Sequence, residues 1–258
     1  MNKDDQPKVA KANYFLEFLV VFLGVTISFW LNEWNEDRKT AELHKEDVVS
    51  LLEDLEKDGE RLSVVLEQAI AGEQRSARLI AVTETYRAGD FGYDAFVDSL
   101  IGIGYVYGYG TFFMNSATYK SLIGSTRIQE FPRGINKQVR DYYEYVSKRV
   151  EDNNDIVDDI SLEYYNVHHP YCQWLNHSEE QQDSASCRAF FAHGDTRSHY
   201  SDLVFYHQTL ALHDRTATHA NQIRHYQSIR DALDSSLMAY GMQILGDRFP
   251  EGHGAVKP

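Results

Sequence analysis

The feature that most constrains this chain is an apolar run near its start, the 17 residues from Phe15 to Leu31, in which Glu17 is the one charged residue. At about 1.5 Å per helical residue the run spans roughly 25 Å, close to the ~30 Å hydrocarbon core of a membrane. Aromatic residues of the kind that favour membrane interfaces flank it: Tyr14, Trp30 and Trp34. The sequence therefore predicts a transmembrane anchor over residues 14–34.

Two other interpretations of the run are a cleaved signal peptide and a buried core helix. A signal peptide is followed by small residues at a cleavage site. This run instead ends in bulky and then charged residues, "FWLNEWNEDRK". We therefore expect an uncleaved anchor, with a buried core helix as the alternative.

Charges beside the run favour one orientation. The arm before it, residues 1–13, contains three lysines, whereas the other flank opens with three acids, Glu33, Glu36 and Asp37, before Arg38 and Lys39. Flanks rich in Lys and Arg tend to stay in the cytoplasm. We expect a cytoplasmic arm and an extracytoplasmic domain.

Small and polar residues share one face of the predicted anchor helix. They are spaced 7, 4, 4 and 3 residues apart, a spacing that keeps them together at about 3.6 residues per turn. They are Glu17, Gly24, Ser28, Asn32 and Asn35. Such faces make helix–helix contacts in lipid. We expect this face to contact another membrane helix, in a homo-oligomer or a membrane-protein partner; alternatively, Glu17 only reaches the lipid headgroups.

The rest of the chain is acidic. The net charge is −14, and residues 1–31 contribute three lysines against three acids, so residues 32–258 account for all of it. An acidic domain repels phosphate backbones. We therefore expect membrane lipid and protein as partners, and no nucleic acid.

Apolar residues recur in steps of 3 and 4 along three further segments, 48–69, 139–167 and 203–244, and no alternation predicts a sheet. The fold class is therefore all-α: an N-terminal transmembrane helix that continues into an antiparallel bundle of about four helices over residues 35–248. Residues 249–258 are expected to form a flexible tail. Four polar or flexible residues occupy seam positions in these segments: Gly59, where we expect a bend, and Arg149, Asn153 and His213.

The segment "IGIGYVYGYGTFF", residues 101–113, alternates glycine with aromatic residues. It lacks the strand and the Lys-Ser/Thr pair of a phosphate-binding loop. We expect a packed irregular loop that brings backbones close together, or the lining of a ligand cleft. A short helix is predicted after it, capped by Ser116 and ending near Gly124.

Cys172 and Cys187 are the two cysteines. In an extracytoplasmic domain they are a disulfide candidate; two buried thiols are the alternative. Histidines crowd the same half of the chain, and the best metal-binding subset is His193, Asp195 and His199. No strong zinc spacing supports that subset.

Acidic residues gather over residues 151–163: Glu151, Asp152, Asp155, Asp158, Asp159 and Glu163. An acid/base pair or a calcium site is one interpretation, and a solvated helix face is the ordinary one. No Gly-x-Ser-x-Gly turn supports a serine nucleophile. We therefore predict no catalytic, cofactor-binding or metal-binding residue, and no cofactor.

The anchor segment "EFLVVFLGVTISFWLNEWNEDRK" resembles the N-terminal segment of a family of uncharacterised bacterial single-pass membrane proteins. The resemblance is carried by a Glu, a central Gly and an Asn-x-Trp-Asn-Glu exit, at Glu17, Gly24, Asn32, Trp34, Asn35 and Glu36. A second, weaker similarity follows at Tyr119, Leu122, Gly124, Ser125, Ile128 and the pair Tyr142-Tyr143. The resemblance implies an anchored helical domain and no established activity. Together with the orientation expected from the flanking charges, a bacterial anchor of this kind leads us to expect an inner-membrane protein with its large domain in the periplasm.

These observations predict a non-enzymatic single-pass membrane protein whose outer bundle mediates protein–protein interaction, as an accessory subunit of a membrane assembly. One alternative is a sensor-like bundle that binds a small molecule near residues 101–113. The other is a metal-dependent hydrolase that uses the histidine subset above.

Overall fold

The computed structural model describes residues 6–106, 110–176, 178–182 and 184–246, with side chains from residue 16 onward except at residues 173, 176 and 179. Within these residues the regular structure is helical and no strand occurs, so the predicted all-α class is confirmed. The predicted tail, 249–258, and the first five residues lie outside the described part of the chain.

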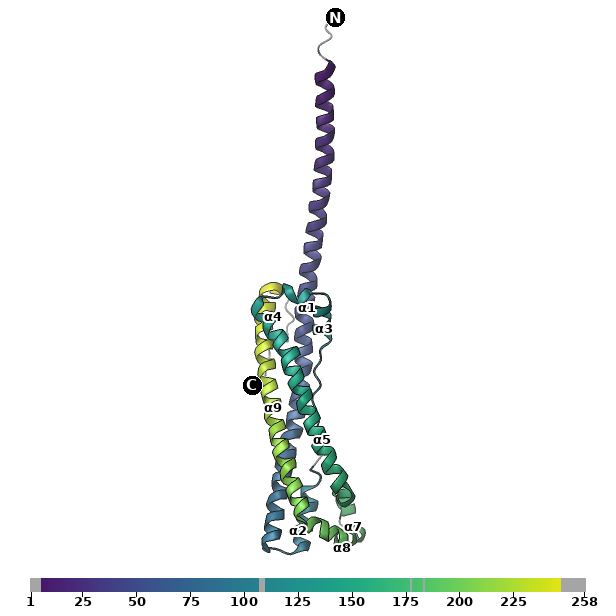
Figure 1. Cartoon of the computed structure of the whole chain (residues 1–258), viewed down its shortest axis with the longest axis vertical. Helices are drawn as coiled ribbons and strands as arrows, with labels where there is room; N and C mark the ends of the chain where they lie inside the picture. Colours follow the sequence, from purple (N-terminus) through teal and green to yellow (C-terminus); the bar gives the residue numbers. More distant parts are fainter. Residues whose placement is uncertain (1–5, 107–109, 177, 183, 247–258) are drawn as a thin grey trace.

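A single helix, α1 (Gln6–Ala88), extends through the predicted anchor and into the bundle (Figure 1). No proline follows Pro7 until Pro132, so nothing in the sequence breaks the backbone hydrogen-bond ladder. Residues 16–42 are exposed throughout, and burial begins around His44 and Asp47. Residues 35–43 therefore form an exposed stretch of helix between the anchor and the packed bundle.

Three long helical rods form the bundle. α1 extends away from the exposed end of the molecule, and α9 (Leu203–Leu245) returns antiparallel beside it (Figure 1). The third rod joins α4 (Arg133–Arg140), a π-helical turn η2 (Asp141–Val146) and α5 (Ser147–Cys172). The rods converge on α9, which packs against both α1 and α5.

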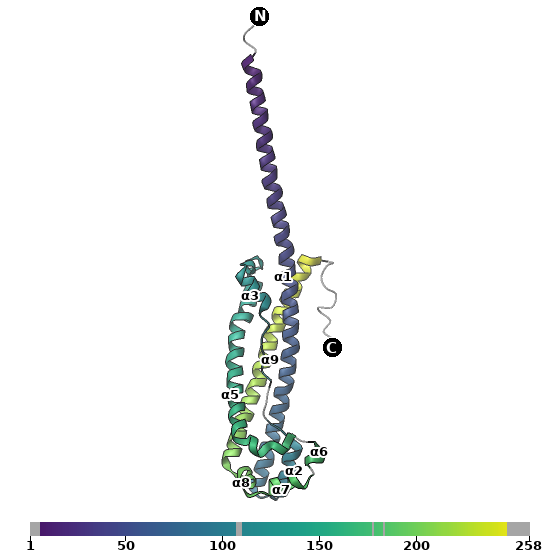
Figure 2. The same cartoon turned by 90° about the vertical axis from the view of Figure 1, so that its right-hand side faces the viewer.

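Shorter helices close the two ends. We call the end nearer the anchor proximal and the other distal. The distal end holds α2 (Tyr93–Ile103), η3 (Gln173–Asn176), α6 (Glu179–Gln182), α7 (Ala185–Ala192) and α8 (Gly194–Ser201). The proximal end holds α3 (Ala117–Gly124) and the 3-10 turn η1 (Arg127–Glu130) (Figure 2). α3 begins after Ser116 as predicted, but the Ser116 side chain makes no capping hydrogen bond. Chain connectivity therefore requires the segment between α2 and α3 to run the length of the bundle.

The predicted seam of the third rod is confirmed at Val139, Tyr142, Val146, Val157 and Tyr164, which are buried. Between them it is off by one position: Val150 and Asn154 are buried, whereas Arg149 is exposed and Asn153 is half-buried. The π-turn η2, an insertion in the helical repeat, directly precedes this stretch. The periodicity of the sequence alone does not reveal that insertion.

The first half of the α9 seam is displaced by one position in the opposite direction, toward the N-terminus. The predicted position His213 is half-buried, and Leu212 and Thr216 are buried in its place. From Ala220 onward the predicted seam is confirmed: Ile223, Tyr226, Leu233 and Leu237 are buried.

Two hydrophobic cores result. The proximal core is mostly aliphatic, with tyrosines at its edge, and includes Val48, Leu51, Leu55, Val139, Tyr142, Ile223 and Leu237. The distal core is richer in aromatic residues and includes Phe96, Tyr164, Phe191, Tyr200 and Phe205. The anchor segment contributes to neither core.

Candidate functional site

The predicted packing face of the anchor is exposed on α1. Ser28 and Asn32 turn their polar groups back onto their own helix: the Ser28 hydroxyl donates to the Gly24 carbonyl at 2.8 Å, and the Asn32 amide donates to Glu36 at 3.0 Å. A Cβ at Gly24 would meet nothing within 4 Å. A shallow depression of about 410 Å³ lies there, lined by Gly24, Val25, Ser28, Phe29 and Asn32.

This face suits a lipid environment. Polar groups that bond to their own backbone do not need water, so the cost of placing them in hydrocarbon is reduced. Glu17 and Asn35, the two ends of the predicted face, are also exposed. Large apolar side chains cover the surrounding surface, for example Val21 at 65% and Phe22 at 57% exposure. Within the described residues, α1 alone contains a segment long and apolar enough to cross a membrane.

The segment after α2 is a connector that lies packed among the three rods. Val106 and Phe112 are buried, and a Cβ at Gly110 would lie 2.2 Å from the Gln68 side-chain oxygen. The interpretation of this segment as a packed loop therefore holds for residues 104–106 and 110–116. The neighbours of Gly110 are side chains, whereas a Cβ at Gly104 would lie 3.6 Å from the Leu175 carbonyl oxygen. Residues 107–109 lie outside the described part.

Buried polar side chains from all three rods bind the connector's backbone. Asn154 on α5 donates to the Phe112 carbonyl at 2.7 Å, and His219 on α9 donates to the Gly110 carbonyl at 3.2 Å. On α1, Asp58 accepts from the Asn115 N–H at 2.8 Å. Because a buried irregular backbone has no ladder partners, these side chains supply the hydrogen bonds that it requires.

Asp58 is fully buried, and it also accepts from the Tyr142 hydroxyl at 2.9 Å. One turn earlier, Asp54 accepts from the Asn115 amide at 2.7 Å and from the Thr118 N–H at 3.2 Å. Burial disfavours the charged form and raises the pKa of Asp58 to about 6, although the hydrogen bonds that it accepts oppose the shift. The two carboxylates hold the connector and η2 against α1.

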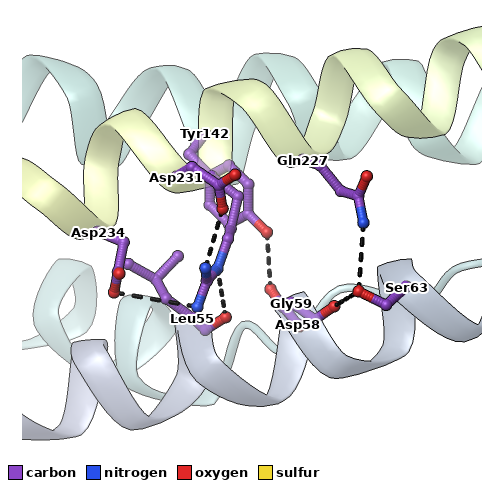
Figure 3. Close-up of polar contacts among 9 residues, drawn as sticks. Leu55, Asp58, Gly59, Ser63, Tyr142, Gln227, Asp231 and Asp234 are labelled. Carbon is purple, nitrogen blue, oxygen red and sulfur yellow. Dashed lines mark hydrogen bonds and ion pairs between the residues drawn. The ribbon is translucent and has the colours of Figure 1, made fainter. Parts of the chain in front are cut away.

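Gly59, where the sequence predicts a bend, lies within the uninterrupted helix α1. Its missing side chain makes room for Arg230 of α9: a Cβ there would lie 2.9 Å from the Arg230 Cζ. The guanidinium donates to the Leu55 carbonyl at 2.7 Å and to Asp231 at 2.9 Å (Figure 3). The position therefore provides close contact between α1 and α9.

A groove beside the connector fits the predicted ligand cleft; it is open and partly apolar. It measures about 590 Å³, and its lining includes Val64, at 54% exposure, and Phe113, at 69% exposure. Glu60 and Arg61 also line it, and Arg61 donates to the Phe113 carbonyl at 3.4 Å.

A neutral histidine pair lies in the distal end. The His168 Nδ1 and the His199 Nε2 are 3.0 Å apart, and the His168 Nε2 donates to Gln208 at 2.7 Å. The His199 ring stacks on Tyr171 at 3.8 Å. Burial lowers the pKa of both histidines to about 4. The pair is therefore uncharged at neutral pH.

The predicted metal-binding subset is not brought together. His193 and Asp195 are exposed and lie 3.8 Å apart, whereas His199 belongs to the pair with His168. No group of three His, Cys, Asp or Glu side chains that could hold a metal ion occurs in the described part of the chain. The acidic residues of 151–163 lie mainly on the exposed face of α5, where Lys148 pairs with Glu151 and Asp152.

The predicted disulfide is corrected by the structure. Cys172 and Cys187 are both buried as thiols, and no bond joins them. The Cys172 sulfur lies 3.6 Å from the Tyr200 hydroxyl, and burial raises the pKa of that thiol to about 11. Two buried thiols are the alternative that the sequence left open.

Asp54, Asp58 and Asn154, which bind the connector and the start of α3, are not among the site residues predicted from the sequence. Polar residues in a hydrophobic seam were the available signal, since a buried carboxylate requires partners. Asp58 lies one position before Gly59, which occupies a position of the predicted seam.

Comparison with protein-family models, with curated proteins and with solved structures finds no match to this chain. The functional argument therefore depends on the residues and the geometry described above.

Proposed function

We propose that this protein is a non-enzymatic, single-pass membrane protein whose helical bundle mediates protein–protein interaction, as an accessory subunit of a membrane assembly. In this proposal α1 is anchored in a bacterial inner membrane, the arm is cytoplasmic and the bundle is periplasmic. The anchor's sequence resemblance to bacterial single-pass membrane proteins supports that placement.

The observation that carries the proposal is the exposed apolar half of α1. It continues without a break into a bundle with its own two cores, so the bundle does not need that apolar surface for folding. Exposed apolar surface of this extent is unfavourable in water. The polar residues inside the bundle bind the connector's backbone and neighbouring helices. These contacts stabilise the folded bundle, a role that suits an interaction domain.

Membrane association is tested with the substitutions Leu19→Arg and Leu23→Arg in the centre of the anchor. Each arginine costs about 3 kcal/mol there, so the pair should abolish membrane association. The measurement is flotation of cell membranes after alkaline extraction. The matched control places the same charges on exposed apolar positions outside the anchor, with Leu43→Arg and Val64→Arg, and should still float. Wild-type protein that stays in the soluble fraction without detergent would refute the proposal.

The partner is tested on the packing face. Gly24→Ile and Ser28→Ile should keep the protein in the membrane but reduce its cross-linking to a second copy or to a co-purifying protein. The control pair on the opposite face of the helix is Leu19→Ile and Leu23→Ile, which should leave cross-linking unchanged. A wild-type chain that is monomeric and purifies alone from native membranes contradicts the interaction role.

The groove at Val64 and Phe113 favours a second candidate function, the binding of a small apolar ligand. A ligand that fills it should raise the melting temperature of the detergent-solubilised protein, because it binds only the folded state. Phe113→Ser should remove that shift. A shift that survives the substitution would exclude the groove as the site.

A further inference from the structure

Basic residues gather at the proximal end of an otherwise acidic bundle. Residues 116–140, which form α3, η1 and α4, contain five basic residues and one acid, a net charge of +4 in a chain of net charge −14. We call this segment the basic cap. Its cations are Lys120, Arg127, Arg133, Lys137 and Arg140.

The basic cap faces the same way as the anchor. α3 and α4 lie at the end of the bundle from which the exposed half of α1 leaves (Figures 1 and 2). Two contacts hold the basic cap beside the first buried residues of α1. Arg127 pairs with Asp47 at 2.7 Å, and the Phe131 ring lies 4.6 Å from the His44 ring. With α1 in a membrane, this end of the bundle therefore faces the bilayer, whichever side the bundle occupies.

The spacing along α1 brings the cap near the headgroups. From Leu31, the last apolar residue of the run, to His44 the helix rises roughly 20 Å. The headgroup layer takes up about 5 to 7 Å of that distance. A helix tilt of about 20° lowers one edge of the bundle further, and long basic side chains extend toward the surface.

Three of the five cations are available to an outside anion. Arg127 and Arg140 form ion pairs with Asp47 and Glu144. Lys120, Arg133 and Lys137 are exposed, and no carboxylate of the described residues forms an ion pair with them. The available charge is therefore on α3 and α4.

A recess of about 720 Å³ brings two of these cations together. Its lining includes Arg133 and Lys137, with Arg140 beside them. Asp141 and Glu144 also line it, but Glu144 is engaged by Arg140 and by the Tyr119 hydroxyl. Two unpaired cations at a concave surface suit the phosphate of a lipid headgroup.

Nearby acids offset part of the charge. Glu46 and Glu130 are exposed at the same end, whereas Asp47 and Glu42 are paired with Arg127 and Lys45. Glu33, Glu36 and Asp37 lie on the exposed stretch of α1 between the apolar run and the cap, beside Arg38 and Lys39. The rest of the acidic excess lies on the sides and distal end of the bundle, which an anionic membrane repels more than the cap. From this segregation of charge we propose that the basic cap binds anionic lipid headgroups of the membrane that holds α1. This inference rests on the proposed membrane anchoring.

The test uses the full chain in vesicles. A donor dye is placed on the cap with Gln138→Cys, or on the distal end with Asp195→Cys, and an acceptor dye is placed on lipid headgroups. Cys172 and Cys187 are buried at 4% and 0% exposure, so the new thiol is the one that reacts. Vesicles contain either neutral phosphatidylcholine alone or a mixture with phosphatidylglycerol.

Energy transfer from position 138 should rise in the anionic vesicles and return to the neutral level at about 1 M salt, where the Debye length is about 3 Å. Transfer from position 195 should not rise. Lys120→Gln, Arg133→Gln and Lys137→Gln together should remove the effect, because each cation near an anionic surface favours binding about fivefold. The control triple Lys57→Gln, Arg78→Gln and Arg215→Gln removes the same charge from exposed positions elsewhere and should keep the effect.

The outcomes separate this inference from the proposed function. Protein that does not float with vesicles refutes the anchoring. Protein that floats but gives the same transfer in neutral and anionic vesicles overturns the lipid-binding cap, and leaves an acidic protein surface as the occupant to examine. Equal loss in both triple variants also overturns it, because the effect would then follow net charge.

Discussion

The two ends of the bundle are packed with different kinds of buried side chain. The proximal end buries carboxylates: Asp47, Asp54 and Asp58 are all less than a tenth exposed. The distal end packs aromatic rings around a neutral histidine pair and a thiol, at His168, His199 and Cys172. The difference follows the backbone, because the proximal end must hold the incoming connector and its unpaired amide groups.

The two ends should consequently respond to pH in opposite directions. Asp58 has a raised pKa, so between pH of about 4 and about 6 the folded state retains a proton that the unfolded state releases, and stability falls as the pH rises. His168 and His199 have lowered pKa values, so between about 4 and 6.5 the unfolded state binds the extra protons, and stability is lost as the pH falls. In the wild-type protein the two trends partly cancel.

The largest expected effect is on the cores themselves. Phe205→Ala removes a buried ring of the distal core and should lower the free energy of unfolding by about 4 kcal/mol. Leu55→Ala, in the proximal core, should cost about 3 kcal/mol. Chemical denaturation followed by circular dichroism gives the totals, and hydrogen exchange gives their location. Loss of protection confined to the mutated end would show that the ends open separately; equal loss at both ends would show one cooperative unit.

The next effect isolates the proximal end. Asp58→Asn removes the buried carboxyl, so the decline in stability between pH 4 and 6, about 2 kcal/mol, should disappear. The pH dependence that remains comes from His168 and His199, so stability should then rise with pH over the same range. Denaturation curves at several pH values measure it, and the exposed substitution Asp155→Asn controls for the change in net charge. An unchanged pH profile would contradict the assignment to Asp58.

A smaller effect isolates the distal end. His199→Phe keeps a ring to stack on Tyr171 but removes one titrating group, so the loss of stability from pH 6.5 down to 4 should shrink by about 1 kcal/mol. His207→Phe, at an exposed position of α9, is the matched control and should leave the loss of stability between pH 6.5 and 4 unchanged. If both variants shift it equally, the histidine pair does not govern the acid response.

The smallest effect concerns the contact between α1 and α9. Replacing a helical glycine with alanine usually stabilises a helix by about 1 kcal/mol. At Gly59 the new methyl group would press on Arg230, so Gly59→Ala should show no gain, or a loss below about 1 kcal/mol. Gly102→Ala in α2 has nothing within 4 Å of the new methyl group and should be neutral or stabilising. A clear gain at Gly59 would show that Arg230 moves without cost.

Patterns that depend on local periodicity predicted the fold well. The all-α class, the single helix through the anchor, the start of a short helix after Ser116 and much of the α1 and later α9 seams follow from spacings of 3 and 4. The first half of α5 departs from the predicted seam by one position, at Val150 and Asn154, whereas Val157 and Tyr164 are buried as predicted. The π-turn η2 could not be predicted, because its signal lies in tertiary packing at Tyr142 and Tyr143.

Predictions for side-chain sites depended on which distant residues meet. His199 was assigned to a metal subset with its sequence neighbours, yet it pairs with His168, from a different helix. Asp58 and Asn154 serve backbone groups of residues 110–116, a relation that spacing along one helix does not encode. Contacts across the bundle therefore decided the site, and sequence periodicity alone does not provide them.

The unbroken course of α1 has a mechanical consequence. From Leu31 to Ala88 the helix extends roughly 85 Å. Since no hinge separates the exposed apolar part of α1 from the part that carries the cores, the molecule should act as a lever. A change of about 10° in the tilt of the anchor would sweep the distal tip sideways by roughly 15 Å. A protein bound at one end of the molecule would therefore be coupled mechanically to movement at the other end.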